Sequence, residues 1–416
     1  MRQRRLHVNW FLIVIVVLLI AVITYVDRYI LPTAQTPFLP TFTATRDPGS
    51  YVTDAQNLFA EGKLLPSIDS YKQAISVKPD DPTTYIALAR VQIFAGQYAD
   101  ALVNSENSLL LNPNNSLAHG MRAWALTQTG DYAGADTSLQ EALRLDPNNG
   151  VILAYKAFLY GKMYENNAGP SLDPLPVAIT ASQDAVTLAP NSLEAHWARA
   201  YILQLTANGE QAIQEYLLAI QLNPNISEIH LELGVSYKGL GVIDSALEQY
   251  TLANTLNPTD TRPYLYSSRA LVSIGEYAKA VQYAESAVTN APTDPYLRGN
   301  WGFMLYKNND FPNALIQLSL AVNGGKNEDG QTVQPQPLTA DDTRIAQYYY
   351  VYAILLARGN RCGEALPITQ LLLTSVPNDT DAAFNVAYVQ QLCSQMLGTP
   401  SATATTTPIV TPTPTP

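Results

Sequence analysis

Three histidines are the first side chains in this sequence that could bind a metal ion. His119, His196 and His230 could each offer a ring nitrogen to zinc, which holds such ligands at about 2 Å. Two acidic pairs, Asp80-Asp81 and Asp341-Asp342, are the clearest candidates for carboxylate chemistry. Whether any of these groups can act together depends on the elements that position them.

No established catalytic motif accompanies these residues. The sequence contains no Gly-rich phosphate loop, no Gly-x-Ser-x-Gly elbow and no His-Glu-x-x-His pair. The net charge of −11 disfavours nucleic acid as a partner, because phosphate binding needs a basic face. The only two cysteines, Cys362 and Cys393, exclude a disulfide-dense scaffold and a four-cysteine metal site. We therefore expect no catalytic residue, no cofactor, no metal and no nucleic-acid partner.

The chain between its two ends repeats itself. Prolines recur at intervals of 34 residues, with one longer interval, at Pro79, Pro113, Pro147, Pro190, Pro224, Pro258 and Pro292. Small alanines follow the same interval, at Ala101, Ala135, Ala178, Ala212, Ala246, Ala280 and Ala314. A fixed period of this length predicts a solenoid, in which each unit packs on its neighbours.

The stretch from Leu231 to Tyr250 shows what one unit contains. Apolar residues recur with a helical period, break at a glycine, and then recur again, which predicts two helices joined by a tight turn. Gly234 would let the second helix approach the first, and Tyr237 and Tyr250 would fill the space left beside this contact. Pro258 would end the second helix, since proline cannot continue one.

This pattern resembles the tetratricopeptide repeat family over roughly residues 48–397. The signature matches best at Leu233, Gly234, Tyr237, Ala246, Tyr250, Ala253 and Pro258. The resemblance implies an all-α fold, a right-handed α-solenoid of about nine helix-turn-helix units with a C-terminal capping helix. The units would lie near 48–81, 82–115, 116–149, 150–192, 193–226, 227–260, 261–294, 295–328 and 346–379, and the cap at 380–397.

The repeat frame argues against a metal site. The three histidines occupy the fourth position of the first helix in their units, and another helix separates each such position from the next. Since helices pack 8–10 Å apart, the rings should lie about 10 Å or more from one another. A structural role is therefore favoured. The acidic pairs fall at helix starts, where carboxylates interact well with the helix dipole.

The N-terminus predicts a membrane anchor. Three arginines precede an apolar run of 17 residues, Trp10 to Val26, which would extend about 26 Å as a helix. We expect a basic cytoplasmic segment over 1–9, a transmembrane helix over 10–31 and a single-pass plasma-membrane protein with its repeats outside. A cleaved signal peptide is the alternative. The Pro/Thr-rich stretches 32–47 and 398–416 predict a linker and a disordered tail.

Two insertions interrupt the period, at 161–174 within the fourth unit and at 324–342 before the ninth. Insertions in solenoids map to loops on one face. They are either tolerated variations in length or loops that help to define a partner site.

The resemblance implies that the first helix of each unit lines a concave groove. Residues that share its inward stripe are mostly aromatic and include few lysines, unlike the Lys, Arg and Asn clusters with which some relatives grip a terminal carboxylate. The predicted partner-binding residues are Trp124, Tyr155, Phe158, Trp197, Tyr201, Tyr266, Arg269, Phe303, Tyr306 and Tyr350. The alternative is that these rings pack between helices at the inner edge.

Three functions are compatible with this pattern of residues. The first is a membrane-tethered, extracytoplasmic scaffold or adaptor that binds a protein or peptide in its aromatic groove. The second is a cell-envelope protein that binds glycans, since aromatic faces stack on sugar rings. The third is an enzyme with a different fold, which the lack of catalytic motifs disfavours, so we expect no enzyme.

The repeat frame also places the two cysteines close together. Cys362 would begin the second helix of the ninth unit, and Cys393 would lie near the end of the antiparallel capping helix. The oxidising space outside a membrane permits a disulfide between them. The alternative is a pair of reduced, buried thiols.

Overall fold

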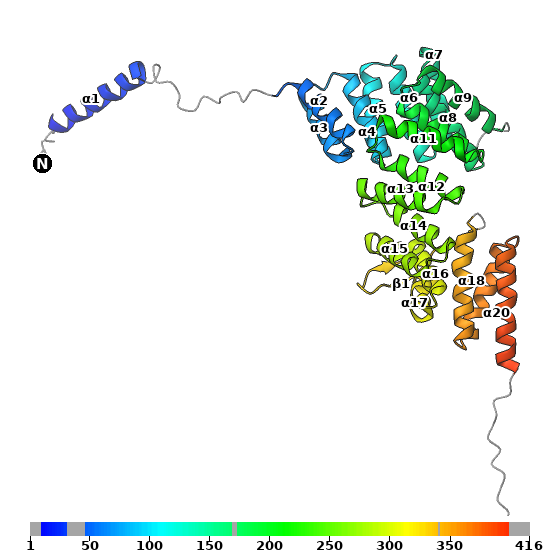
Figure 1. Cartoon of the computed structure of the whole chain (residues 1–416). Coiled ribbons are helices and arrows are strands. Elements are labelled where there is room, and N and C mark those ends of the chain that lie inside the picture. The colour runs from blue at the N-terminus through cyan, green and yellow to red at the C-terminus, as the bar shows by residue number, and fades with distance from the viewer. Residues whose placement is uncertain (1–9, 31–45, 169–172, 340–341, 399–416) are drawn as a thin grey trace, which may run out of the picture.

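A computed structural model describes residues 10–30, 46–168, 173–339 and 342–398. From Pro48 on, these residues form a solenoid of helices, apart from one short β-hairpin of strands β1 (Gly325–Lys326) and β2 (Thr332–Val333). Figure 1 shows the helices stacked from α2 to α20 along a curved array. The chain therefore buries its core between successive helices, as the 34-residue period predicts.

Each unit consists of two antiparallel helices. The first helices are α2 (Pro48–Ala60), α4 (Pro82–Phe94), α6 (Ser116–Thr129), α8 (Gly150–Glu165), α10 (Leu193–Leu205), α12 (Ser227–Gly239), α14 (Arg262–Ser273), α16 (Pro295–Lys307) and α18 (Thr343–Arg358). The second helices are α3 (Leu64–Val77), α5 (Tyr98–Leu111), α7 (Tyr132–Leu145), α9 (Leu175–Leu188), α11 (Gly209–Leu222), α13 (Ile243–Leu256), α15 (Tyr277–Asn290), α17 (Phe311–Asn323) and α19 (Cys362–Ser375). Helix α20 (Thr380–Gly398) follows the last pair.

The turn inside each unit requires a left-handed residue. Five of these turns use glycine with φ between 73° and 84°, at Gly62, Gly96, Gly130, Gly241 and Gly275. Glycine adopts this conformation without steric cost, which explains why the glycines follow the period. The remaining turns place Asn167, Ala207, Asn309 and Asn360 at positive φ.

The expected close approach at Gly234 is confirmed. A Cβ atom at this position would lie 2.5 Å from a ring carbon of Tyr250 and 3.2 Å from the carbonyl oxygen of Ala246. The Tyr250 ring is buried against the first helix of its own unit. Glycine and tyrosine are thus two halves of one packing contact between α12 and α13.

The links between units stop one helix and start the next. Asn115 and Asn149 cap α6 and α8, since their side chains accept hydrogen bonds from backbone amides at 3.1–3.2 Å. Asp81 and Asp294 cap α4 and α16 in the same way. Such caps satisfy amide groups that have no partner within the helix.

The first units also contact units far along the chain. The guanidinium of Arg90 on α4 donates to the carboxylate of Glu194 on α10 at 2.5 Å. The side-chain amide of Asn225 donates to the carbonyl oxygen of Ala60 at 2.8 Å. Gly62 packs so closely that a Cβ atom there would lie 2.6 Å from the carbonyl oxygen of Asn225. These contacts close the N-terminal part of the array onto itself.

The second insertion packs against α16 and α17. Arg298 on α16 is buried and lies 3.3 Å from the carboxylate of Glu328 in the hairpin. Asn327 accepts a backbone hydrogen bond from Gln331, and Val333 is buried. The hairpin therefore stabilises the eighth unit.

The capping helix α20 covers the apolar side of the ninth unit. Val386 and Val389 are buried within the same cluster as α18 and α19. Cys362 and Cys393 form a disulfide, with their Cα atoms 5.6 Å apart and their positions 31 apart in sequence. That separation lies within the range of unstrained disulfides.

The predicted transmembrane anchor over 10–31 is wrong. Helix α1 ends at Tyr25 after 16 residues and is followed by a π-helical turn, η1 (Val26–Ile30). Sixteen residues span about 24 Å, short of the roughly 30 Å hydrocarbon core of a bilayer. Across the part of the chain that the structure describes, no helix combines the length and apolar character needed to cross a membrane. The predicted localisation as a single-pass plasma-membrane protein is therefore wrong as well.

Three predicted segments fall largely outside the described residues. They are the basic segment 1–9, the linker 32–47 up to residue 45, and the tail from residue 399.

Candidate functional site

The closure of the N-terminal units leaves a cleft of about 950 Å³ on the inner side of the array. Its walls come from the turn after α2, the end of α4, helices α8 and α10, the start of α12 and the link between α13 and α14. We call it the inner cleft. Its size is within the range of pockets that bind ligands or side chains.

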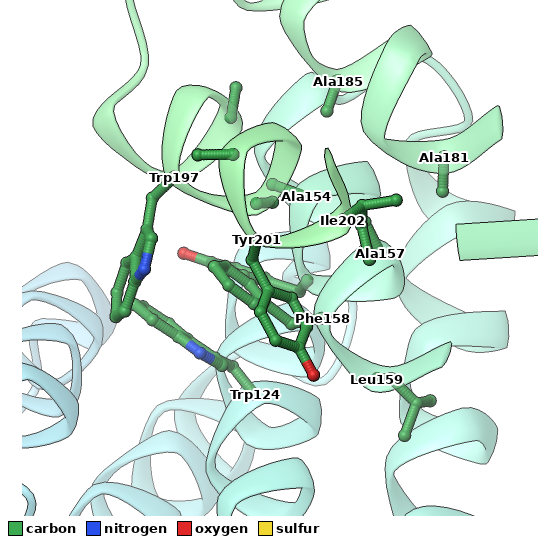
Figure 2. Packing of buried hydrophobic residues seen from close by; sticks show 14 of the residues in the cluster. Trp124, Ala154, Ala157, Phe158, Leu159, Ala181, Ala185, Trp197, Tyr201 and Ile202 are labelled. Carbon is green, nitrogen blue, oxygen red and sulfur yellow. The ribbon is translucent and has the colours of Figure 1, made fainter. Parts of the chain in front are cut away.

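Five rings of the predicted aromatic stripe, together with Phe94, form one cluster beneath this cleft. Six rings take part, and we call them the aromatic cluster: Phe94, Trp124, Tyr155, Phe158, Trp197 and Tyr201. Figure 2 shows how Trp124, Phe158, Trp197 and Tyr201 converge from different helices. Neighbouring ring centroids lie 4.8–6.0 Å apart, the separation at which aromatic pairs attract each other.

The structure corrects the prediction that Trp124 and Tyr155 contact a partner. Trp124 is 0% exposed and Tyr155 is 1% exposed. Their rings stack 4.8 Å apart, and Trp124 also meets Phe94, Phe158 and Trp197. Because the first six units curl tightly, residues on the inward stripe reach one another across units and become core.

Phe158, Trp197 and Tyr201 lie at the boundary between core and cleft. They line the inner cleft, but at most 9% of each residue is exposed. The Trp197 ring packs edge-on against Phe158 at 5.0 Å and stacks on Phe94 at 5.6 Å. These residues therefore form the floor of the cleft, although most of each ring is buried against other rings.

The remaining predicted residues lie in different places. Tyr266 lines the inner cleft. Arg269 is half-buried, donates to the side-chain oxygen of Asn300 at 3.2 Å and lies over the Tyr296 ring. Its guanidinium is thus engaged by neighbouring units.

Phe303 and Tyr350 are both largely buried, and Tyr306 is half-buried. Tyr350 borders a second hollow of about 420 Å³ between α18 and the link before α20. The structure therefore does not bring the ten predicted residues together in one continuous groove.

Part of the first insertion builds the wall of the cleft. Helix α8 has 16 residues, whereas α4 and α10 have 13 each, and its last turn carries Lys162 and Glu165. Both side chains line the cleft and form an ion pair at 2.7 Å. The Tyr201 hydroxyl donates to the same Glu165 carboxylate at 3.1 Å.

Sequence reasoning did not identify Glu232, a carboxylate on α12 that lines the cleft. Its one hydrogen bond within the described residues comes from the side-chain amide of Gln204, at 3.4 Å. Burial raises the pKa of Glu232 to about 7, and the nearby Glu228 adds to the rise. No sequence pattern predicted a special role for Glu232, because its raised pKa depends on which charged residues surround it in the folded chain.

The Arg90–Glu194 pair shows a different electrostatic environment. Burial alone would raise the pKa of Glu194, but the Arg90 guanidinium outweighs burial and holds the pKa below its ordinary value. This pair is therefore ionised and bridges α4 and α10 beside the aromatic cluster. Its role is to hold the first turn of the array closed.

The three histidines have structural roles. In His119, His196 and His230 the Nε2 atom lies 2.8–2.9 Å from the carbonyl oxygen of the proline six residues earlier. The second nitrogen of His196 contacts the Glu215 carboxylate at 2.6 Å, and this hydrogen bond raises the pKa of His196. Within the described residues, no group of three or more potential ligands could hold a metal ion.

Comparisons with known proteins support the repeat architecture. A sequence model described as the tetratricopeptide repeat matches residues 116–149, which contain α6 and α7. No curated protein is significantly similar in sequence to this chain.

Two solved structures share the arrangement of helices. One is the crystal structure of the APC/C hetero-tetramer Cut9–Hcn1, with a TM-score of 0.59 and 15% identity over 77% of this chain. This chain spans 59% of the length of that one. The other is a human IFIT1 dimer with PPP-AAAA, with a TM-score of 0.54, 16% identity and 83% of each chain covered. At these identities the similarity shows the fold alone.

Proposed function

Because this chain is a tetratricopeptide repeat protein, we propose that it acts as a scaffold and binds a segment of another protein in the inner cleft. The observation that carries the proposal is the cleft itself, about 950 Å³ between units that are distant in sequence. A partner segment there would contact several units at once. Binding, without a chemical reaction, is the activity that we assign to it.

The composition of the cleft suits a protein partner. Its floor is aromatic, at Phe158, Trp197 and Tyr201, and its rim is charged, at Lys162 and Glu228. Protein interfaces commonly combine an aromatic centre with a polar rim. Glycan binding has weaker support, because sugar rings need free aromatic faces and these rings are packed against one another.

A photo-crosslinking experiment tests this proposal. A benzophenone amino acid replaces Leu65, which is 60% exposed and lines the cleft, or Leu110, which is 82% exposed on α5 and does not. Irradiation of cells that express each variant should give a discrete protein adduct from position 65 alone. Equal adducts from both positions, or none from 65, would contradict the proposal. A saccharide adduct would favour the glycan alternative.

A further inference from the structure

The inner cleft contains seven charged side chains, four acidic and three basic. The three basic residues all have acidic partners: Lys63 pairs with Glu61 at 2.8 Å, and Lys162 pairs with Glu165 at 2.7 Å. Arg262 pairs with both Glu228 and Asp260, at 2.6 and 2.8 Å. The cations of the cleft are thus already neutralised.

Glu232 is the one exception among these charged residues. Within the described part of the chain, no lysine, arginine or histidine forms an ion pair with its carboxylate, and the side-chain amide of Gln204 donates to it at 3.4 Å. The charges of Lys162 and Arg262 lower the pKa of Glu232 from beyond ion-pair distance, but they do not offset burial. The carboxylate stands among tyrosines, since it acts electrostatically on Tyr201, Tyr216 and Tyr266. A partly buried carboxylate without a cation is costly, because the protein replaces little of its lost hydration.

We propose that Glu232 receives the side chain of a lysine or arginine carried by the protein partner. The inference rests on the proposed function, because it specifies the chemistry of the segment that enters the inner cleft. The cationic group would form an ion pair with Glu232, and its aliphatic stem would lie along the aromatic floor.

The surroundings of Glu232 favour a basic side chain over other cations. Tyr266 lines the cleft, and aromatic faces attract ammonium and guanidinium groups, as they do where the Lys162 ammonium lies 5.1 Å from the centroid of the Tyr201 ring. The long stems of lysine and arginine can cover apolar surface while their charged ends reach an acceptor. The chain carries a net charge of −11, which also accelerates encounters with basic partners.

The protonation behaviour of Glu232 agrees with this arrangement. Burial raises its pKa to about 7, and the neighbouring Glu228 adds to the rise. A cation placed beside the carboxylate would favour its charged form and lower that pKa. The unpaired acid is therefore a group that a basic ligand would stabilise.

Peptide selection on the full chain tests the inference. A random 12-residue library is selected on the wild-type protein, and calorimetry then measures the chosen peptides on wild type, Glu232→Gln and Glu141→Gln. We expect the peptides to share one lysine or arginine. Replacing it by glutamine or citrulline should weaken binding to wild type at least tenfold, but hardly change binding to Glu232→Gln.

Glu141→Gln is the control, because Glu141 on α7 is paired with Arg144 at 2.7 Å and does not line the cleft, while its replacement removes the same charge. We expect it to change affinity less than threefold. The citrulline peptide tests the wild-type chain directly, so the result does not depend on how Glu232→Gln folds. Free spermidine serves as a further probe, and binding as tight as that of the peptides would overturn a protein source for the cation.

Three outcomes separate this inference from the proposed function. The inference is overturned if the selected peptides share no basic residue. It is also overturned if replacing their basic residue weakens binding to Glu232→Gln as much as binding to wild type. Both results leave the scaffold function standing. A selection that yields no binder competing for the cleft overturns both. A shared basic residue that contributes to affinity for wild type but not for Glu232→Gln supports both proposals.

Discussion

The two ends of the array are secured in different ways. The N-terminal units close through non-covalent contacts between residues far apart in sequence, such as Arg90 with Glu194, 104 positions away. The C-terminal unit and its cap are joined by one covalent bond between Cys362 and Cys393, 31 positions apart. A solenoid ordinarily gains stability only from contacts between neighbouring units. The long-range contacts at one end and the disulfide at the other therefore add stability that the repeat itself does not provide.

The comparison extends to the inward stripe of the first helices. In α6, α8 and α10 the stripe residues stack on one another across units, as Trp124, Phe158 and Trp197 do. In α14 the equivalent Arg269 donates a hydrogen bond to Asn300 of the next unit instead. The same repeat position therefore serves aromatic packing in α6 and α8 and a polar contact in α14. In the tightly curved N-terminal units this position also reaches beyond the neighbouring unit, as the pair of Arg90 with Glu194 shows.

The largest effect should come from removing the centre of the aromatic cluster. Trp124→Ala deletes a ring that is 0% exposed and meets Phe94, Tyr155, Phe158 and Trp197. A buried tryptophan replaced by alanine costs about 3–5 kcal/mol. We expect the midpoint of urea unfolding to fall accordingly, with amide hydrogen exchange accelerating first in α4 to α10.

Trp301→Ala provides the comparison from the other end. Trp301 on α16 is only half-buried and lies outside the aromatic cluster. Loss of the Trp301 ring should lower the free energy of unfolding by less than loss of Trp124, and it should accelerate amide hydrogen exchange in α14 to α18. If both variants lost the same free energy of unfolding, ring contacts between units would add no stability beyond ordinary core packing.

The second prediction concerns the disulfide. Replacing Cys362 and Cys393 together by alanine should cost about 3–4 kcal/mol in the chain-entropy model for a loop of this length. Amide exchange should accelerate in α18, α19 and α20, while α4 to α10 remain as protected as in the wild type. Uniform acceleration along the whole array would show that the two ends are coupled.

A free-thiol assay on the unfolded wild-type protein gives the control. The bonded protein offers no thiol to an alkylating reagent before reduction and two after it. Two thiols before reduction would support the alternative of reduced, buried cysteines. In that case the double replacement should lower the free energy of unfolding only by the packing contribution of two small side chains.

The period of the sequence predicted much of this structure. Proline and glycine spacing located the helix pairs, because these residues stop helices and make left-handed turns. Gly234 and Tyr250 were paired correctly, since both belong to one unit and the contact is local. Cys362 and Cys393 were placed together for the same reason, as neighbouring helices of a solenoid must pack.

The inner cleft could not be predicted in this way. The contacts of Arg90 with Glu194 and of Ala60 with Asn225 join residues 104 and 165 positions apart, and no 34-residue pattern encodes them. They depend on small rotations that accumulate from unit to unit. Burial of Trp124 and isolation of Glu232 both follow from that curvature. The anchor was wrong because the α-helix ends at Tyr25, before the predicted end at Leu31, and is too short to span a bilayer.

The smallest expected effect isolates the N-terminal closure itself. Gly62 and Gly96 occupy equivalent turns with φ of 75° and 73°, so alanine would be strained similarly at both, by about 1–2 kcal/mol. Only Gly62 contacts a distant unit: a Cβ atom there would lie 2.6 Å from the carbonyl oxygen of Asn225, while one at Gly96 would meet nothing within 4 Å. Gly62→Ala should therefore destabilise the chain by about 1 kcal/mol more than Gly96→Ala, because overpacking costs roughly 1–3 kcal/mol unless the contact opens.

Opening of that contact would also be visible directly. We expect Gly62→Ala to accelerate amide exchange around Asn225, on the far side of the contact, and Gly96→Ala to leave that region unchanged. The difference between the two unfolding midpoints then measures what the closure contributes. Identical midpoints and identical exchange near Asn225 would mean that the first unit rests against Asn225 without holding the array closed. The Arg90–Glu194 pair and the aromatic cluster would then be sufficient to set the curvature that forms the cleft.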